Sequence, residues 1–386
     1  MSQNIYLDHA ATSAIRPEAE ALILEALRLG GNPASVHATG RKALLMMETA
    51  RGQVARLVGA SVTDVVFTSG GTEANALAIE SAALHPDITT LIVSAIEHDC
   101  VLETARAAAV AHGKALQICP VTREGVLDLE ALDALLARGS GRPFVALMLA
   151  NNETGVIQPV ADVAARLTPR RGWLHVDAVQ AAGKIPLDWA SLGCDTLSLS
   201  AHKLGGPQGV GALIYGAGAT LVRRLHGGGQ ERGRRSGTEN LSGIAGFGAA
   251  AEAAQAELSF GPYDSGARDL ALAALEAAGA IIVGKGAPRL PHILNVVTPG
   301  WSAQLQVMAM DLRGIRVSAG SACSSGKVKS SRVLEAMGYG EDAACGLRLS
   351  GGWNTQDSDW AAAVEAWLAC HQQYQARRPQ FMAQGA

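Results

Sequence analysis

The sequence predicts an α/β protein with one large, mainly parallel sheet and a smaller α+β unit after it. Short apolar runs rich in Val, Ile and Leu alternate with longer amphipathic stretches up to about residue 215. This alternation is typical of strand–helix–strand units, whose parallel strands are buried on both faces. After about residue 245 an alanine-rich stretch and then a mixture of short strands and helices indicate the second unit.

The elements of the larger unit follow from these runs. Two helices are expected first, at residues 17–29 and 41–58, and Pro17 suits a first helical turn. Buried strands bounded by turn residues are expected at 64–69, 90–95, 115–120, 143–150, 173–177, 195–200 and 209–215. Helices are expected between several of them, at 72–84, 100–111, 128–137 and 159–167. These seven strands predict one sheet sandwiched by helices.

The smaller unit follows a connecting helix at residues 244–258. Its expected helices are 267–278, 303–313 and 357–374, and its expected strands are 280–283, 292–297, 316–318 and 347–350. Residues 375–386 are expected to fray, because chain ends often lack packing partners.

Composition excludes several classes of protein. The 386 residues carry a net charge of −3, and no run of Lys or Arg is longer than two. This argues against a nucleic-acid or anionic-membrane surface. The first residues have no basic and apolar signal pattern, and no apolar run reaches 18 residues, so a cytoplasmic protein is expected.

The six cysteines predict buried thiols with one exception. They are Cys100, Cys119, Cys194, Cys323, Cys345 and Cys370, and their spacing contains no zinc-binding pattern, so no metal site is expected. Cys323 differs because it lies in a stretch of Ser, Gly and Ala near Lys327 and Lys329. A positive charge nearby favours the reactive thiolate.

Three motifs follow predicted strands and suggest a site at the sheet's carboxyl edge. Lys203, in the sequence SAHK, has small residues around it that suit a Schiff-base lysine, although most lysines are simply exposed. Asp177 could keep a pyridine ring nitrogen protonated or cap a helix. The glycine-rich turn at residues 68–73 can bind an anion at a helix N-terminus, but a plain turn has the same pattern.

The ordered motifs resemble the class V aminotransferases of pyridoxal phosphate (PLP) fold type I. They are residues 7–12 (LDHAAT), 31–35 (GNPAS), 67–73 (FTSGGTE), 151–153 (NNE), 175–177 (HVD), 200–203 (SAHK) and 235–238 (RSGT). Residues 318–328 (SAGSACSSGKV) are similar to the active-site loop of NifS/IscS-type cysteine desulfurases. The resemblance implies that residues 1–15 join the small domain, that 16–250 form the large domain, and that 251–386 form the small domain with the Cys323 loop.

The resemblance also implies the roles of the site residues. Lys203 would bind the cofactor as a Schiff base and move the α-proton, Cys323 would attack the substrate sulfur, and His98 would stack on the ring and act in proton transfer. The implied cofactor-binding residues are Gly71, Thr72, His98, Asn152, Asp177, Gln180, Ser200, His202, Lys203 and, from the neighbouring subunit of a homodimer, Thr238. Asn152 and Arg348 would bind the substrate carboxylate, and Cys323 could transiently ligate an iron–sulfur cluster.

The implied reaction converts L-cysteine to L-alanine and leaves a persulfide on Cys323. The sulfur acceptor would be an iron–sulfur scaffold or a tRNA or cofactor thiolation pathway. The sequence departs from many relatives at His9 and Trp353, and the docking tail of the best-studied members is not expected. The alternatives are a selenocysteine lyase or C–S lyase, a class V aminotransferase, and a non-catalytic scaffold with the same fold.

Overall fold

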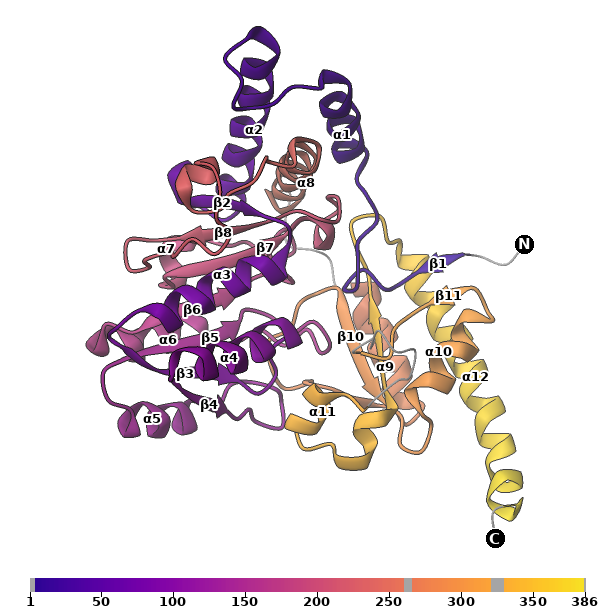
Figure 1. The fold of residues 1–386 in the computed structure, drawn as a ribbon. Coiled ribbons are helices and arrows are strands. Elements are labelled where there is room, and N and C mark those ends of the chain that lie inside the picture. Colours follow the sequence, from indigo (N-terminus) through magenta and orange to yellow (C-terminus); the bar gives the residue numbers. More distant parts are fainter. Residues whose placement is uncertain (1–3, 260–265, 321–329, 385–386) are drawn as a thin grey trace.

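The computed structural model describes residues 4–259, 266–320 and 330–384, with residues 378–384 described by their backbone only. Two lobes lie side by side in Figure 1. The larger lobe contains the main sheet, and the smaller lobe, in orange and yellow, contains most of the C-terminal third of the chain.

The larger lobe is built on a seven-stranded sheet in the order β2-β8-β7-β6-β5-β3-β4. Its strands are β2 (Val65–Thr68), β3 (Ile88–Ser94), β4 (Ala115–Cys119), β5 (Arg142–Met148), β6 (Trp173–Asp177), β7 (Thr196–Ser200) and β8 (Gly211–Tyr215). β8 runs antiparallel to both β2 and β7, and the other neighbours are parallel. The predicted α/β class and the seven strands are therefore confirmed.

Helices cover both faces of this sheet. They include α3 (Gly71–Leu84), α4 (Asp99–His112), α5 (Leu129–Arg138), α6 (Val160–Leu167) and the short α7 (Trp189–Leu192). Successive strand residues face opposite sides, so Phe144 packs in the apolar cluster with α3 and α4, and Val145 packs in the cluster with α5 and α6. Burial on both faces explains why the strands are apolar along their whole length.

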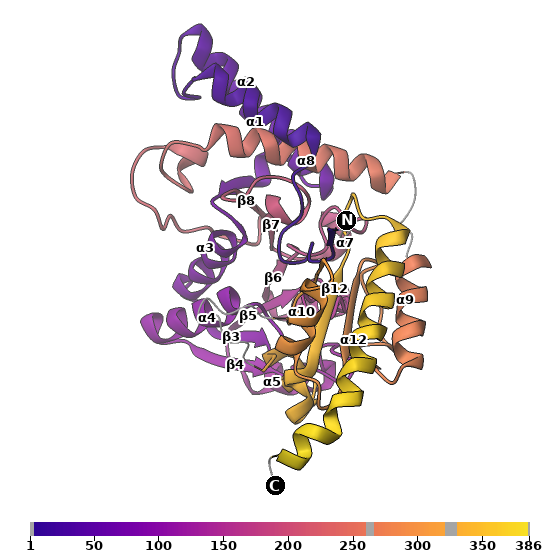
Figure 2. The same ribbon diagram turned by 90° about the vertical axis from the view of Figure 1, so that its right-hand side faces the viewer.

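A helical layer lies at one end of the large lobe. It consists of α1 (Pro17–Leu29), α2 (Ala38–Leu57) and α8 (Leu241–Ser259), and Figure 2 shows α8 running beneath the other two. The domain boundary that the sequence suggests at residue 250 lies inside α8 and stays a prediction.

The smaller lobe contains a three-stranded antiparallel sheet in the order β12-β10-β9. Its elements are α9 (Gly266–Ala277), β9 (Ile281–Ile282), β10 (Ile293–Val297), α10 (Ala303–Asp311), β11 (Ile315–Arg316), α11 (Arg332–Ala336), β12 (Gly346–Ser350) and α12 (Asp357–Gln384). β1 (Ile5–Tyr6) pairs in parallel with β11 and so attaches the N-terminal segment to this lobe.

One expectation about the chain end is wrong. Residues 375–386 were expected to fray, but α12 continues as a helix to Gln384. The segment extends a helix whose first half is packed, and its Gln, Ala and Arg residues favour helix, although Pro379 within it does not. None of the helices in the described part of the chain combines the length and the apolar character needed to cross a membrane.

Candidate functional site

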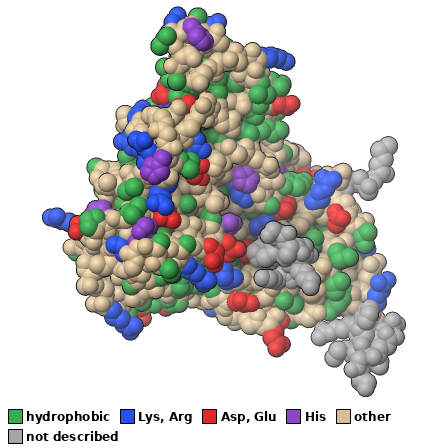
Figure 3. Space-filling view, viewed as in Figure 1, with side chains coloured by type: hydrophobic (Ala, Val, Ile, Leu, Met, Phe, Trp, Pro, Cys, Tyr) green, Lys and Arg blue, Asp and Glu red, His purple; other side chains and the backbone are tan. Residues whose placement is uncertain are grey.

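A cavity of about 360 Å³ lies at the carboxyl edge of the main sheet, between the two lobes. Loops after several parallel strands supply one wall, and residues of the N-terminal segment and the small lobe supply the other. Acidic, basic and histidine side chains gather over this part of the face in Figure 3. Sites at the carboxyl ends of strands are usual in open α/β sheets.

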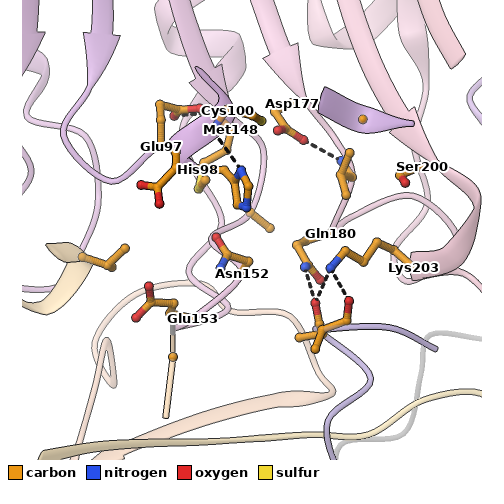
Figure 4. A pocket seen from close by; sticks show the side chains of 18 of the residues that line it. Glu97, His98, Cys100, Met148, Asn152, Glu153, Asp177, Gln180, Ser200 and Lys203 are labelled. Carbon is orange, nitrogen blue, oxygen red and sulfur yellow. Dashed lines mark hydrogen bonds between the residues drawn. The ribbon is translucent and has the colours of Figure 1, made fainter. Parts of the chain in front are cut away.

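Most of the predicted site residues line this one cavity. They are Gly71, Thr72, His98, Asn152, Asp177, Gln180, Ser200, His202, Lys203 and Arg348. The fold brings them together from six segments. Five of these segments end or follow strands of the main sheet, and the sixth is β12, which carries Arg348. Figure 4 shows His98 beside Asp177, and Gln180 beside Lys203.

Asp177 ends β6 and is almost completely buried. Its Oδ2 accepts a hydrogen bond from Asn75 Nδ2 at 2.7 Å, and its Oδ1 accepts one from the Val179 backbone N–H at 3.0 Å. Burial raises the pKa of this carboxyl. Among the described residues Asp177 forms no salt bridge with Lys or Arg, so its carboxylate faces the cavity without a direct cationic partner.

Lys203 lies in a short 3-10 turn directly after β7. Its Nζ donates hydrogen bonds to the backbone oxygens of Ala10 and Ala11, both at 2.7 Å, and Gln180 Nε2 donates to the same Ala10 oxygen at 2.9 Å. Burial, together with the nearby Arg348 guanidinium, lowers the pKa of Lys203 to about 8. At this pKa roughly a tenth of the amine is neutral, and nucleophilic, at pH 7.

The turn between β2 and α3 provides a helix N-terminus that faces the cavity. A Cβ added to Gly71 would lie 2.8 Å from Val179 Cγ2, so this turn approaches the loop after β6 closely. Ser200 ends β7, and His202 lies in the 3-10 turn that follows. Burial lowers the pKa of His202 to about 4, which keeps it neutral near pH 7. Backbone N–H groups of α3 and these side chains are suited to bind an anion such as a phosphate.

His98 caps the N-terminus of α4. Its Nδ1 accepts a hydrogen bond from the Cys100 backbone N–H at 3.1 Å, which leaves its exposed ring at the cavity. This fixed ring lies beside Asp177, where it can stack on a planar ligand whose nitrogen faces the carboxylate.

Arg348 is a buried cation on β12. Its Nη1 donates to the Asn152 backbone oxygen at 2.9 Å, and its Nη2 donates to Asp8 Oδ1 at 2.6 Å. Its Nε has no hydrogen-bond partner among the described residues. A buried guanidinium N–H without a partner is suited to bind a carboxylate oxygen.

Two predicted residues are not placed in this cavity. Thr238 is exposed and does not line it, so its role toward a neighbouring subunit stays a prediction. Cys323 lies outside the described residues. The described residues on both sides of that segment, including Gly320 and Arg332, line the cavity.

Several cavity residues were missed from the sequence. Asp8, Asn75, Glu97, Cys100 and Glu153 all line the cavity. Burial raises the pKa of Glu97 well above its ordinary value, and its Oε1 accepts a hydrogen bond from the Met148 N–H at 2.7 Å. A polar residue inside an apolar helix, such as Asn75 in α3, was the signal available.

The other cysteines agree with the expectation of buried thiols, apart from Cys100. Cys119, Cys194, Cys345 and Cys370 are buried, and Cys100 is half-buried at the cavity. Burial raises the pKa of Cys100 to about 12, so this thiol stays protonated and is a poor nucleophile. In the described part of the chain no group of His, Cys, Asp or Glu is arranged to hold a metal ion.

Known proteins are similar to this chain in sequence and in fold. The family model described as aminotransferase class-V matches residues 5–359. A cysteine desulfurase of Cereibacter sphaeroides is 40% identical over 374 residues, which cover 94% of this chain and 93% of that protein. The X-ray structure of a NifS-like protein from Rickettsia africae has a TM-score of 0.87 at 32% identity, covering 96% of this chain and 100% of that one. A structure of SspA in complex with cysteine has a TM-score of 0.78 at 28% identity, covering 90% and 98%.

The family match spans nearly the whole chain. Of the predicted site residues that the structure describes, all but Thr238 line one cavity. The chain belongs to the class V aminotransferase family, among its NifS/IscS-type cysteine desulfurases.

Proposed function

We propose that the protein is a cysteine desulfurase that converts L-cysteine to L-alanine and keeps the sulfur as a persulfide on Cys323. The observation that carries the proposal is one cavity that joins a low-pKa lysine, a buried carboxylate and a buried arginine. Its support from known proteins is the 40% identity to a cysteine desulfurase and the similar structure that holds cysteine.

The cavity fits PLP as the cofactor. Asp177 is a buried carboxylate that faces the cavity without a salt bridge from a described Lys or Arg, which suits a protonated ring nitrogen. Lys203 supplies the amine for a covalent bond, His98 a ring to stack on the cofactor, and Gln180 an amide beside the lysine. The N-terminus of α3, with Thr72, Ser200 and His202, would bind the phosphate.

The residues of the chain divide the chemistry between them. PLP, when bound, makes the Cα proton of the substrate acidic and accepts the electrons left behind. Arg348 binds the substrate carboxylate through guanidinium N–H groups that its bonds to Asn152 and Asp8 leave unused, with the Asn152 side chain beside it. Lys203 Nζ takes the proton from Cα and later returns it, and the lowered pKa of this amine makes it an effective base near neutral pH.

Sulfur transfer needs a second nucleophile, which is the proposed role of Cys323. Its thiolate attacks the substrate sulfur, a sulfur–sulfur bond forms, and the Cβ–sulfur bond breaks. The electron pair of that bond leaves with the carbon fragment, and protonation of this fragment gives L-alanine. His98 would move a proton during this step. Homodimer formation, the sulfur acceptor and a cytoplasmic location remain predictions.

The test measures L-alanine and protein-bound persulfide after the PLP-loaded protein is mixed with L-cysteine. Equal amounts of alanine and persulfide are expected in a single turnover, and sulfide is expected when a thiol reductant is added. Cys323→Ser should keep the PLP absorbance and lose the persulfide, whereas Cys370→Ser, a change at a buried thiol of the small lobe, should keep both. Unchanged sulfide release by Cys323→Ser would contradict the assignment.

The same assay separates the alternatives. Faster turnover of selenocysteine or cystine than of cysteine would favour a lyase, and keto-acid-dependent amino transfer would favour an aminotransferase. No PLP absorbance, even after PLP is added, would favour a non-catalytic scaffold.

A further inference from the structure

A chain of hydrogen bonds runs through the interior of the large lobe and ends on Asp177. Trp173 Nε1 donates to Thr196 Oγ1 at 3.0 Å, and Thr196 Oγ1 lies 2.9 Å from His175 Nδ1. His175 Nε2 lies 2.9 Å from Asn75 Oδ1, and Asn75 Nδ2 donates to Asp177 Oδ2 at 2.7 Å. All but Asp177 are almost completely excluded from solvent, and Asp177 itself is 7% exposed at the cavity.

The hydrogen atoms of this chain can be assigned at each link. An indole nitrogen only donates, so the Thr196 oxygen accepts from Trp173 and is free to donate its own proton to His175 Nδ1. An ionised Asp177 only accepts, so the Asn75 amide nitrogen faces it and the amide oxygen faces His175. His175 must then carry its proton on Nε2.

The opposite donor and acceptor order along these hydrogen bonds is less favourable. With Asp177 protonated and donating, the Asn75 amide would turn over and His175 would carry its proton on Nδ1, pointing at Thr196. The Thr196 oxygen would then accept two hydrogen bonds, and the described residues show no further acceptor for its buried hydroxyl proton. A buried donor without a partner is unfavourable, so one direction is preferred.

His175 is suited to this role because it stays neutral and its ring is fixed. Burial lowers the pKa of His175 to about 3, so the ring carries one proton near neutral pH. Its ring stacks on Phe144 with centroids 6.4 Å apart and an interplanar angle of 12°. Its position two residues before Asp177 on β6 places both side chains on the same face of the sheet.

We propose that Asn75 and His175 are positioning residues, which hold the Asp177 carboxylate ionised and aimed at the ring nitrogen of the cofactor. Thr196 and Trp173, at the end of the hydrogen-bond series away from Asp177, determine which atom donates in each of its hydrogen bonds. This inference rests on the proposed function only in naming the cofactor, because the hydrogen bonds lie within the protein itself. Asn75 and His175 act through Asp177 and do not take part in bond making.

The first test reads the proton on His175 directly. Nitrogen NMR on the full-length protein, labelled at histidine and prepared without PLP, separates a protonated ring nitrogen from an unprotonated one. The expected result is a neutral His175 with the proton on Nε2, assigned by comparison with His175→Gln. A proton on Nδ1, or a charged ring near neutral pH, would overturn the proposal.

The second test compares two substitutions at His175 by their affinity for PLP. Phe fills the space of the ring but cannot donate to Asn75, whereas the amide nitrogen of Gln can reach the position of Nε2 and restore that bond. His175→Phe and Asn75→Leu should therefore weaken PLP binding to the protein by about tenfold or more, with His175→Gln close to the unaltered protein.

Thr298→Val controls for the loss of a buried polar group, because Thr298 Oγ1 has no hydrogen-bond partner among the described residues and takes no part in the hydrogen bonds from Trp173 to Asp177. Equal PLP affinity for His175→Phe and His175→Gln would overturn the proposal. These readouts are independent of desulfurase activity. If His175 carries its proton on Nε2 but no alanine forms, the proposed function is contradicted and the positioning role is not. If alanine forms but His175 carries its proton on Nδ1, the positioning role is contradicted and the proposed function is not.

Discussion

Arg348 Nη2 donates a hydrogen bond to Asp8 Oδ1 at 2.6 Å, which joins the small lobe to the N-terminal segment at the cavity. The Asn152 backbone oxygen holds Nη1 on the other side, so the guanidinium plane is fixed before a substrate arrives. Each Nη keeps a second N–H, and Nε has no partner among the described residues. The fixed guanidinium therefore still offers donors to a substrate carboxylate.

Arg348→Lys should raise the KM for L-cysteine more than it lowers kcat. An ammonium group can replace the charge but cannot bond Asp8, the Asn152 oxygen and a carboxylate in one plane. The expected increase in KM is about 10- to 100-fold, since a hydrogen bond to a charged group contributes about 1.5–3 kcal/mol. Steady-state alanine formation measures it. Arg316→Lys is the matched control, because Arg316 is exposed on β11 and contacts Asn4.

The lowered pKa of Lys203 predicts that covalent PLP attachment depends on pH. Its pKa is lowered from 10.5 to about 8 in the folded protein, so the neutral amine increases as pH rises through 8 and levels off about one pH unit above it. The rate of PLP attachment should follow that curve. Between pH 8 and about 10.5 the unfolded chain would bind this proton more tightly than the folded one, so the contribution of Lys203 to stability rises with pH across that window.

Lys184→Met provides the control for this profile. Burial also lowers the pKa of Lys184 to about 8, but Lys184 does not line the cavity. Its substitution should leave the pH profile of PLP attachment unchanged, whereas Lys203→Ala should abolish attachment. A profile that is flat around pH 8 in the unaltered protein would contradict the role of the lowered pKa.

Patterns within single segments predicted most of the fold. Each strand of the main sheet is apolar along its length because both of its faces are covered, and that property is visible in the sequence alone. β1 was missed because two residues carry no periodic pattern, and only the pairing of Ile5 with Ile315 makes them a strand. Residues 375–384 are helical although fraying is expected for a chain end, because they continue the helix that begins at Asp357.

The site was predictable where a residue follows a strand, and not where its role depends on distant partners. Asp177 and Lys203 are recognisable from their motifs and the strands before them. Asn75 and His175 are ordinary members of a helix and a strand until folding brings them within 2.9 Å of each other. Asp8 likewise acquires its role only when β12 places Arg348 beside it.

The close approach of Gly71 to Val179 predicts that a substitution at one position can be compensated at the other. A Cβ at this position would lie 2.8 Å from Val179 Cγ2, too close for two carbon atoms, so Gly71→Ala should push apart the α3 turn and the loop after β6. PLP affinity should fall in Gly71→Ala and recover in Gly71→Ala/Val179→Ala, which removes the contacting methyl group. Gly139→Ala is the control, since its added Cβ would meet neighbours only at ordinary distances from 3.7 Å. No recovery in the double variant would contradict the steric explanation.

The buried ion pair between Arg51 and Glu231 supports the strand that leads into the α3 turn. Arg51 Nη1 and Nη2 donate to the two carboxylate oxygens at 2.7 and 2.8 Å, and Glu231 also accepts from the Phe67 backbone N–H on β2 at 2.9 Å. The two side chains are only 4% and 2% exposed. Glu231→Ala leaves the buried Arg51 guanidinium with Glu48 as its remaining ionic partner and the Phe67 N–H without its acceptor, so the free energy of unfolding should fall by about 3 kcal/mol, the lower end for a broken buried pair.

The matched comparison is the exposed pair Arg56–Glu252, whose side chains are 57% and 60% exposed. Glu252→Ala should change the free energy of unfolding by less than about 1 kcal/mol, because water screens exposed charges and solvates the remaining arginine. Urea unfolding of the two variants, followed by circular dichroism, provides both values. Similar losses for the two substitutions would show that burial does not set the strength of the Arg51–Glu231 pair. A large loss of unfolding free energy for Glu231→Ala alone would show that the Glu231 carboxylate stabilises β2 and the turn that follows it.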